Sequence, residues 1–280
     1  MSLTRSALLV LAVALPGLLL GCQKSEEHPP FAAGCEKNCS PLPGISVGMS
    51  GGTAGSPSTN PDGGTGTLEG QVLLLTDDTF VHAALYADGA TVTADGASGS
   101  PVTGTWDGAD PYSLDGVAAV PTNWVSVKPA LVGGDPLLTY QAVQTNQVSN
   151  VDLALVSGDV LDGIFTAAST VRSPDSGQVV LFFRSAGTGA ALSGLHVTMA
   201  SAQVALYQAA SGWVLDDGTA VTNASGLVVF GNVEPANSTG TQTVVVTRAA
   251  TTTTAAADGG QFAVKVVQAA VTIATVAVQF

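Results

Sequence analysis

The chain has 280 residues, of which 46% are hydrophobic and only 10% are charged, and its formal net charge is -13 at pH 7. The 8 basic residues are scattered, and none lies between Lys37 and Lys128. Binding to nucleic acid requires clustered Lys and Arg side chains that neutralise phosphates, so this composition excludes a nucleic-acid-binding protein. Abundant Val, Ala, Thr, Ser and Gly instead indicate strands and turns with a neutral surface, which suits a protein outside the cytoplasm.

An apolar run covers residues 7–20, shortly after Arg5. The run is about 14 residues long, whereas a helix that crosses a bilayer needs roughly 20 residues. It therefore has the proportions of a signal-peptide core and is too short for a membrane span. We expect residues 1–21 to be a signal peptide.

The apolar run ends in Leu19-Leu20-Gly21-Cys22, which resembles the lipobox of bacterial lipoproteins. The resemblance implies that Cys22 carries a thioether-linked diacylglycerol, becomes the first residue of the mature chain and receives a further acyl chain such as palmitate. Two acyl signals hold a protein stably on a membrane, whereas one gives marginal binding. Because Gln23 is not Asp, the resemblance also implies the outer membrane. The alternative is an ordinary secreted protein whose Cys22 lies in the discarded peptide or pairs elsewhere.

Residues 22–66 are rich in Gly, Ser, Pro, Thr and Asn. Such a segment cannot bury enough apolar surface to offset its ordering entropy, so we expect a lipidated, disordered tether. A Gly-rich coil of about 44 residues has a root-mean-square reach of roughly 35–40 Å. That reach is enough to hold a folded body clear of the lipid headgroups.

Cys35 and Cys39 lie within this tether, separated by Glu-Lys-Asn. An oxidising compartment permits a disulfide between them, and its short loop would contribute about 2 kcal/mol. Two alternatives remain open. The cysteines are free thiols, or they belong to a metal site, whose ligand set His28 alone does not complete. We predict the local disulfide, with no metal site and no cofactor.

Short alternating segments begin at Leu68. They are rich in Val and Thr, have a period of two and are bounded by Gly, Asp, Asn or Pro, which is the pattern of half-buried strands. Asp-Gly pairs at residues 95–96 and 107–108 indicate turns between them. No long stretch shows helical spacing. The segments of this first half are residues 70–75, 90–94, 112–117, 124–129 and 151–155.

The second half repeats this order of segments. Its corresponding segments are residues 177–183, 193–199, 222–233, 243–247 and 271–278. The two sets define a tandem repeat of about 100 residues per unit, joined near residues 157–159. We therefore predict an all-β fold of two tandem β-sandwiches, the first over residues 67–157 and the second over residues 158–280.

The order of the segments resembles the carboxypeptidase regulatory-like, or transthyretin-like, family of seven-stranded β-sandwiches. Its hairpin motif, Thr-Asp-x-x-Gly-x-Phe-x-Phe-x-x-Val, fits the second half well, and the first half less well because residues 109–111 lengthen the turn. The matching residues are Thr222, Asn223, Gly226, Val228, Phe230 and Val233. These motifs belong to turns and core, so the resemblance concerns fold and hardly activity. A single immunoglobulin-like pair of sheets is the alternative.

No catalytic motif accompanies the strands. The sequence holds no His-Glu-x-x-His or Gly-x-x-x-x-Gly-Lys pattern, and it lacks the zinc ligands of a carboxypeptidase. Besides His28, the histidines are His82 and His196. His196 alternates with apolar neighbours, so we expect it to face solvent or a polar groove. We predict that the protein is not an enzyme.

Acidic residues gather in the expected turns, at residues 77–78, 107–110 and 216–217. Loop carboxylates can bind calcium, which takes about six to eight oxygen ligands. Asp also favours turns without any ion, because its side chain accepts hydrogen bonds from nearby backbone amides. We favour the turn role.

Four large aromatic residues, Trp106, Tyr112, Trp124 and Trp213, are candidates for stacking on sugars at a sandwich rim. Residues of this kind belong more often to the core. The alternation around Trp124 does not assign it to either face of its strand.

These features predict a non-catalytic envelope lipoprotein, held by its lipid anchor at the bacterial outer membrane, on the periplasmic or the outer face. Two β-sandwich modules would bind or brace an unidentified envelope protein, by addition to a sheet edge, or a polysaccharide. The alternative function is a ligand- or ion-binding accessory subunit of a transport or secretion assembly.

Overall fold

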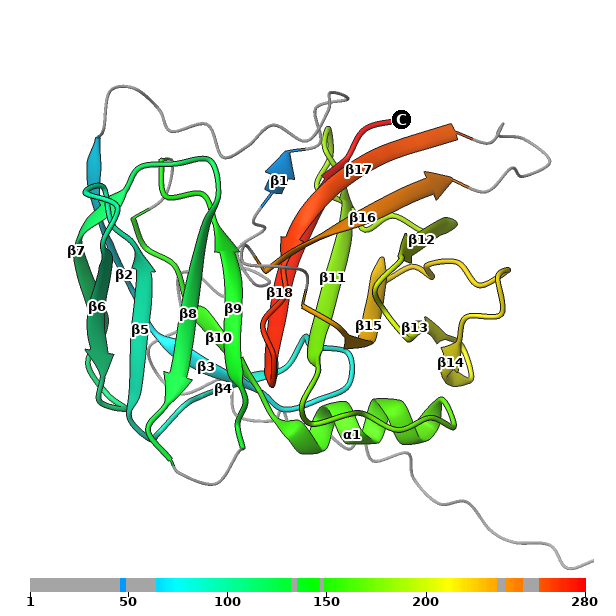
Figure 1. The fold of residues 1–280 in the computed structure, drawn as a ribbon, viewed down its shortest axis with the longest axis horizontal. Coiled ribbons are helices and arrows are strands. Elements are labelled where there is room, and N and C mark those ends of the chain that lie inside the picture. Colours follow the sequence, from blue (N-terminus) through cyan, green and yellow to red (C-terminus); the bar gives the residue numbers. More distant parts are fainter. Residues whose placement is uncertain (1–45, 49–63, 132–134, 147–148, 236–239, 249–256) are drawn as a thin grey trace, which may run out of the picture. The chain divides into compact units, whose positions relative to one another are not determined.

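The structure is a computed structural model that describes residues 46–48, 64–131, 135–146, 149–235, 240–248 and 257–280. These residues form strands β1 to β18 and one helix, α1 (Figure 1). The predicted all-β fold is therefore confirmed. The strands are β1 (Ser46–Gly48), β2 (Thr65–Gly70), β3 (Val72–Leu75), β4 (Ala83–Leu85), β5 (Ala90–Asp95), β6 (Pro101–Trp106), β7 (Tyr112–Ala118), β8 (Asn123–Pro129), β9 (Leu138–Val143), β10 (Leu153–Val156), β11 (Gly177–Ser185), β12 (Leu195–Met199), β13 (Val204–Ala209), β14 (Gly212–Leu215), β15 (Leu227–Val233), β16 (Thr241–Arg248), β17 (Ala257–Lys265) and β18 (Ala270–Val278).

In the first half of the chain, two groups of strands enclose one core. In one group, β2 pairs antiparallel with β7, and β3 pairs parallel with β10 and antiparallel with β4. The other group has the order β6-β5-β8-β9. Buried side chains from both groups, such as Leu68, Tyr112, Val92 and Val125, belong to one apolar cluster. Apolar residues at alternate positions of each strand make this β-sandwich.

The second half repeats these pairings. β11 pairs antiparallel with β15, as β2 pairs with β7 in the first half. β11 also pairs parallel with β18, as β3 pairs with β10. β12 pairs with β16, and β16 with β17, as β5 pairs with β8 and β8 with β9. One strand changes sheet, because β13 pairs with β15 whereas β6 pairs with β5. The strand pairing thus agrees with the repeat read from the sequence.

The last strand joins the sheets of the two halves. β18 pairs parallel with β11 and also with β9 of the first half, where Ala270 lies opposite Leu138 and Ile273 opposite Gln141. β1 pairs with β18 farther along. The result is a ten-stranded sheet in the order β14-β13-β15-β11-β18-β9-β8-β5-β6, with β1 beside β18 (Figure 1). β1 and the start of β2 lie in the segment that the sequence assigns to the tether.

The sequence predicts no helix, but α1 (Gly158–Ala167) directly follows the first half. The Ser157 hydroxyl caps it by accepting a hydrogen bond from a backbone amide of the first turn at 3.2 Å. Leu161, Ile164 and Phe165 are buried on one face of the helix. The helix has only 10 residues, so its apolar pattern is too short to be distinguished from that of a strand.

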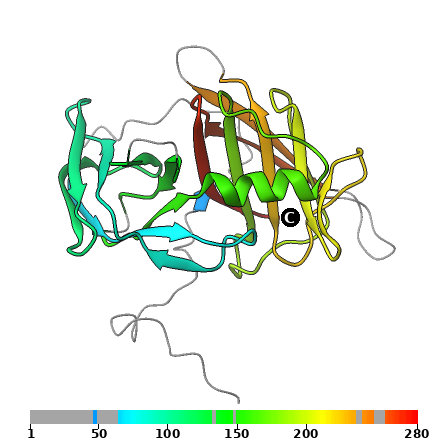
Figure 2. The ribbon, with the colours of Figure 1, turned by 90° about the horizontal axis from the view of Figure 1, so that it is seen from below.

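A second apolar core lies beneath α1 and joins the two halves. It takes side chains from β3 and β10, from α1, and from β11, β15 and β18. The buried members are Leu75, Phe80, Ala154, Val156, Leu161, Ile164, Phe165, Ala168, Val180, Phe182, Leu206, Trp213, Leu227, Val229, Val271 and Ile273. Figure 2 shows α1 running across the strands of the second half. Because both halves contribute to this core, they cannot separate without exposing apolar surface.

Loop 76–82, between β3 and β4, extends the first half into this core. The Phe80 ring is 1% exposed and meets Phe182 of β11 edge-on, with the ring centroids 6.4 Å apart. The neighbouring Asp78 carboxylate accepts a hydrogen bond from Trp213 Nε1 at 3.2 Å. An apolar contact and a polar contact from one loop therefore fix the first half against the second.

Side chains close two of the strand edges. On β12, the Tyr207 hydroxyl donates to the Val197 carbonyl and accepts from the Val197 amide, both at 2.8 Å. On β10, Gln141 Oε1 accepts a hydrogen bond from the Ala154 amide at 3.0 Å. The backbone groups of Val197 and the Ala154 amide are therefore not available to another strand, which hinders sheet addition at these positions.

Candidate functional site

The predicted lipidation site Cys22 and the predicted disulfide partners Cys35 and Cys39 lie outside the described residues, as does His28. The signal peptide, the lipid anchor and the disulfide therefore stay predictions. Within the described ranges, no helix combines the length and the apolar character needed to cross a membrane.

Each of the two described histidines has a carboxylate beside it. The His196 side chain on β12 is 29% exposed, and its Nε2 atom lies 3.4 Å from Asp216 Oδ2. The prediction that His196 faces solvent or a polar groove is met only in part, because the ring is partly exposed but its Nε2 atom is buried. The largely exposed His82 contacts Asp77 through Nδ1 in loop 76–82. Neither pair belongs to a larger cluster, since the described residues hold no group of three or more His, Cys, Asp or Glu side chains that could bind a metal ion.

The acidic residues of the turns bind nearby backbone amides. Asp107 Oδ1 accepts hydrogen bonds from the Ala109 and Asp110 amides at 2.9 and 3.0 Å, and these bonds lower the pKa of Asp107. Asp217 Oδ1 accepts from the Thr219 hydroxyl at 2.6 Å and from the Thr219 amide at 2.9 Å, which lowers the pKa of Asp217. Hydrogen bonds of this kind stabilise the carboxylate and fix the turn. Asp107 and Asp217 therefore have the turn role that the sequence favours.

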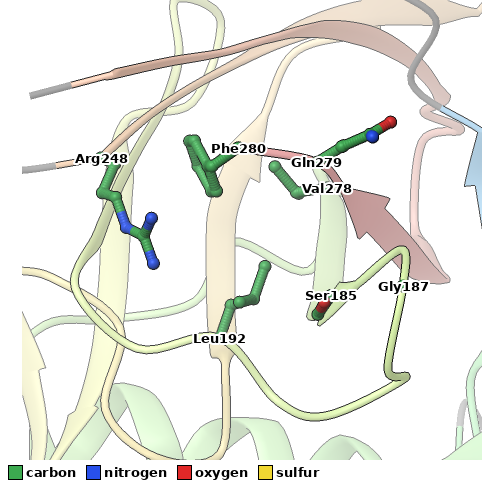
Figure 3. A pocket seen from close by; sticks show the side chains of 7 residues that line it. All are labelled: Ser185, Gly187, Leu192, Arg248, Val278, Gln279 and Phe280. Atoms are coloured by element: carbon green, nitrogen blue, oxygen red, sulfur yellow. The ribbon is translucent and has the colours of Figure 1, made fainter.

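A cavity of about 290 Å³ opens beside the end of β18 (Figure 3). Its lining residues are Ser185, Gly187, Leu192, Arg248, Val278, Gln279 and Phe280. The Arg248 guanidinium lies 4.6 Å from the centre of the Phe280 ring, within the range of a cation–π contact. Figure 3 shows the Arg248 and Phe280 side chains next to each other and Gln279 pointing away from them. Among the described residues, the lining contains no His, Asp or Glu.

Three of the four aromatic candidates belong to the core. Trp106, Tyr112 and Trp213 are 1%, 0% and 3% exposed. The Trp106 indole donates a hydrogen bond to the Tyr86 carbonyl at 2.8 Å, and the Tyr112 hydroxyl donates to the Val151 carbonyl at 2.6 Å. These aromatic side chains anchor strands to one another and do not reach a rim where they could meet a sugar.

Trp124 differs, because it lies on the outward side of the first sandwich. Alternate residues of β8 are buried, so Trp124, Ser126 and Lys128 share the outer side of the strand. The same alternation places a set of hydroxyl side chains on the outer side of β6, β5, β8 and β9, whose strands lie next to one another in Figure 1. We call this surface the hydroxyl face, and its hydroxyl-bearing residues are Thr91, Thr93, Thr103, Thr105, Ser126 and Tyr140.

The hydroxyl face is a candidate binding site that sequence reasoning missed. The available signal was Thr-x-Thr at residues 91–93, repeated at residues 103–105. The second copy lies in β6, which the sequence analysis does not predict because Pro101 and Gly104 weaken its strand pattern. Without β6, the two copies do not become neighbours.

No protein-family profile matches the chain, and no curated protein matches it. Among solved structures, the shaft pilin SpaA from Lactobacillus rhamnosus GG is 13% identical, with a TM-score of 0.22 and coverage of 76% of this chain and 98% of the pilin. The minor pilin GBS52 from Streptococcus agalactiae is 11% identical, with a TM-score of 0.22 and coverage of 76% and 95%. These similarities are too weak to assign the chain to a family. The strand pairing within the chain defines it as a double β-sandwich protein.

Proposed function

We propose that the chain is a non-catalytic envelope protein, in which a rigid pair of β-sandwiches presents a binding face to a partner outside the cytoplasm. A lipid at Cys22 would hold it at the outer membrane, and the part of the predicted tether that precedes β1 would set its distance from the lipid. The partner would be a polysaccharide or another envelope protein. The observation that carries this proposal is the apolar core shared by the two halves.

Rigidity is the physical property that the shared core supplies. Neighbouring domains in one chain move relative to each other unless their interface is large and hydrophobic. Here the halves share the core beneath α1 and the pairing of β18 with β9. The Lys265 ammonium of the second half also lies 5.0 Å from the centre of the Tyr140 ring of the first half. A body with these contacts transmits force between its ends and holds its surfaces in fixed positions, as a bracing or presenting protein must.

Differential scanning calorimetry tests the rigid body. We expect one transition whose calorimetric and van't Hoff enthalpies agree, because the two halves cannot unfold separately without exposing the shared core. Two resolved transitions would show that the halves unfold independently, and this result would contradict the proposal.

Membrane attachment is tested separately with the Cys22→Ser variant of the full chain. We expect the wild-type protein in the membrane fraction, with an acylated mature N-terminus by mass spectrometry, and the variant in the soluble fraction. Cys35→Ser is the matched control and should remain with the membrane. Recovery of soluble wild-type protein with an unmodified Cys22 thiol would contradict the anchor.

A further inference from the structure

The hydroxyl face carries its hydroxyl groups in ordered rows across the sheet. Thr103 lies opposite Thr93, Thr93 opposite Ser126, and Ser126 opposite Tyr140, so one row crosses β6, β5, β8 and β9. Adjacent strands are about 4.8 Å apart, and the row therefore extends over roughly 14 Å. A second row crosses β6, β5 and β8, in which Thr91 lies between Thr105 and Lys128.

These hydroxyl groups are available to a ligand. The strand alternation makes Thr91, Thr103 and Thr105 exposed and leaves Thr93 and Ser126 half-buried. Within the described part of the chain, none of the hydroxyl groups of the face forms a hydrogen bond to another residue. This differs from the Thr222 hydroxyl, which accepts from the Leu195 amide at 3.0 Å and donates to the Leu192 carbonyl at 2.8 Å. The face thus offers a periodic set of unused donors and acceptors.

Two lysines stand beside these rows, although the whole chain has a net charge of -13. Lys128 and Lys265 are the lysines of the described residues. Lys128 stands on the face next to Thr91, and the Lys265 ammonium lies over the Tyr140 ring. The four strands of the face carry a single carboxylate, Asp95, at the end of β5. With Lys265 included, the face has two lysines and one carboxylate, which favours an anionic partner.

We propose that the hydroxyl face binds a polysaccharide whose sugars carry carboxylate groups. This inference rests on the proposed function and names the partner of the presented surface. The Thr and Ser hydroxyls would exchange hydrogen bonds with sugar hydroxyls, the two lysines would pair with carboxylates, and Trp124 would supply an apolar surface at the edge of the face.

The same chemistry argues against a protein partner at this face. Energetically dominant residues of protein interfaces are Trp, Tyr and Arg in well-packed, desolvated pockets, whereas Ser and Thr are under-represented among them. Lys and Ser are also depleted at such interfaces. The hydroxyl face offers mainly Thr and Ser hydroxyls with flanking lysines, and its two aromatic residues, Trp124 and Tyr140, are half-buried. It therefore matches a hydrated polymer that is bound by many weak polar contacts better than it matches a protein partner.

The test measures binding of the full chain to polygalacturonate, to its methyl ester and to dextran by isothermal titration calorimetry. The ester retains the sugar hydroxyls and loses the charge, and dextran lacks carboxylates altogether. We expect binding to polygalacturonate that weakens as salt is raised, and binding to the ester that is weaker by about tenfold. Absence of binding to polygalacturonate, or equal binding to the ester, would overturn the proposal.

Variants then locate the site. The double variant Thr93→Val/Thr103→Val removes two neighbouring hydroxyls and keeps β-branched side chains, and we expect it to bind polygalacturonate about tenfold more weakly. Lys128→Gln should also reduce the affinity and its salt dependence. Thr243→Val, at an exposed position of β16, is the matched control and should bind like the wild type. Unchanged binding by both face variants would overturn the assignment of the site.

The outcomes separate this inference from the proposed function. A protein that unfolds in one transition and remains on the membrane, but does not bind polygalacturonate, keeps the proposed function and loses this inference. Loss of binding accompanied by two unfolding transitions in the wild-type protein would contradict both. Capture of an envelope protein that the double threonine variant no longer binds would replace the polysaccharide with a protein partner.

Discussion

Replacement of Phe80 by Ala tests whether loop 76–82 holds the two halves together. The Phe80 ring is 1% exposed and packs edge-on against Phe182 in the shared core. Phe80 has a positive φ of 54°. Since Ala also carries a Cβ atom, the substitution leaves the strain of this backbone conformation in place. The measured change in stability therefore reports the loss of packing.

The expected cost follows from the burial of the ring. Truncation of a fully buried Phe to Ala typically removes about 3–5 kcal/mol of unfolding free energy. For a body of this size, 3 kcal/mol corresponds to a decrease in Tm of roughly 6–12 °C. We expect a single unfolding transition at the lower temperature, measured by calorimetry and by urea titration followed by circular dichroism.

Val81→Ala is the matched control, because Val81 is the next residue and is 70% exposed. An exposed truncation of this kind should change the unfolding free energy by less than about 0.5 kcal/mol. A double-mutant cycle with Phe182→Ala should give a coupling energy of about 0.5–1.5 kcal/mol for the aromatic pair. The reasoning about the shared core is refuted if Phe80→Ala lowers the unfolding free energy no more than Val81→Ala does. It is also refuted if Phe80→Ala splits the single unfolding transition into two.

Three further predictions concern turns and edges. Gly226→Ala should lower the urea midpoint of unfolding more than Gly189→Ala does. Both glycines have φ near +69°, but only at Gly226 would the new Cβ meet a carbonyl oxygen, at 2.4 Å. Equal losses of stability would contradict this steric explanation. Tyr207→Phe should cost about 1–3 kcal/mol and speed hydrogen exchange at the Val197 amide, because it leaves buried backbone groups of β12 unpaired. Burial raises the pKa of Asp77, but hydrogen bonds from its own loop outweigh burial, and the pKa lies below the usual 3.8. The stabilisation by this carboxylate is thus complete above pH 3.8 and is lost as the pH falls through the lowered folded-state pKa. Urea titrations should show the wild type more stable than Asp77→Asn at pH 6 and equal to it near the acid end, and a constant difference at all pH values would refute this.

The local sequence was sufficient for many of the strands, for the turns around the acidic residues and for the repeat, but it did not reveal strands such as β6 and β9. Alternating apolar residues, such as those of β5 and β8, reveal a strand because side chains on opposite faces meet different environments. The motif from Thr222 to Val233 predicts its turn correctly, because Gly226 adopts a positive φ and the Asn223 side chain accepts a hydrogen bond from the Ser225 amide at 2.8 Å. Each of these features depends on residues that are close in the chain.

The sequence predicts only part of the hydroxyl face, because this surface depends on residues that are far apart in the chain. Period two assigns Trp124, Ser126 and Lys128 to one side of a strand, but not to the inner or outer side of the sandwich. That choice depends on which face of the sheet the opposite strands cover, and the burial of Val125 and Val127 shows that it is the other face. The hydroxyl rows likewise require the register between strands that lie far apart in the sequence.

The sequence by itself determined an all-β chain with two similar halves and with acids that hold turns, because these properties follow from short-range periodicity and from hydrogen bonds between near neighbours. Only the tertiary structure decided that α1 covers a core common to both halves, that β18 pairs with β9, and that Phe80 packs on Phe182. The physical reason is that burial and strand pairing are satisfied by any apolar face and any free edge within reach, so a local pattern does not name the partner.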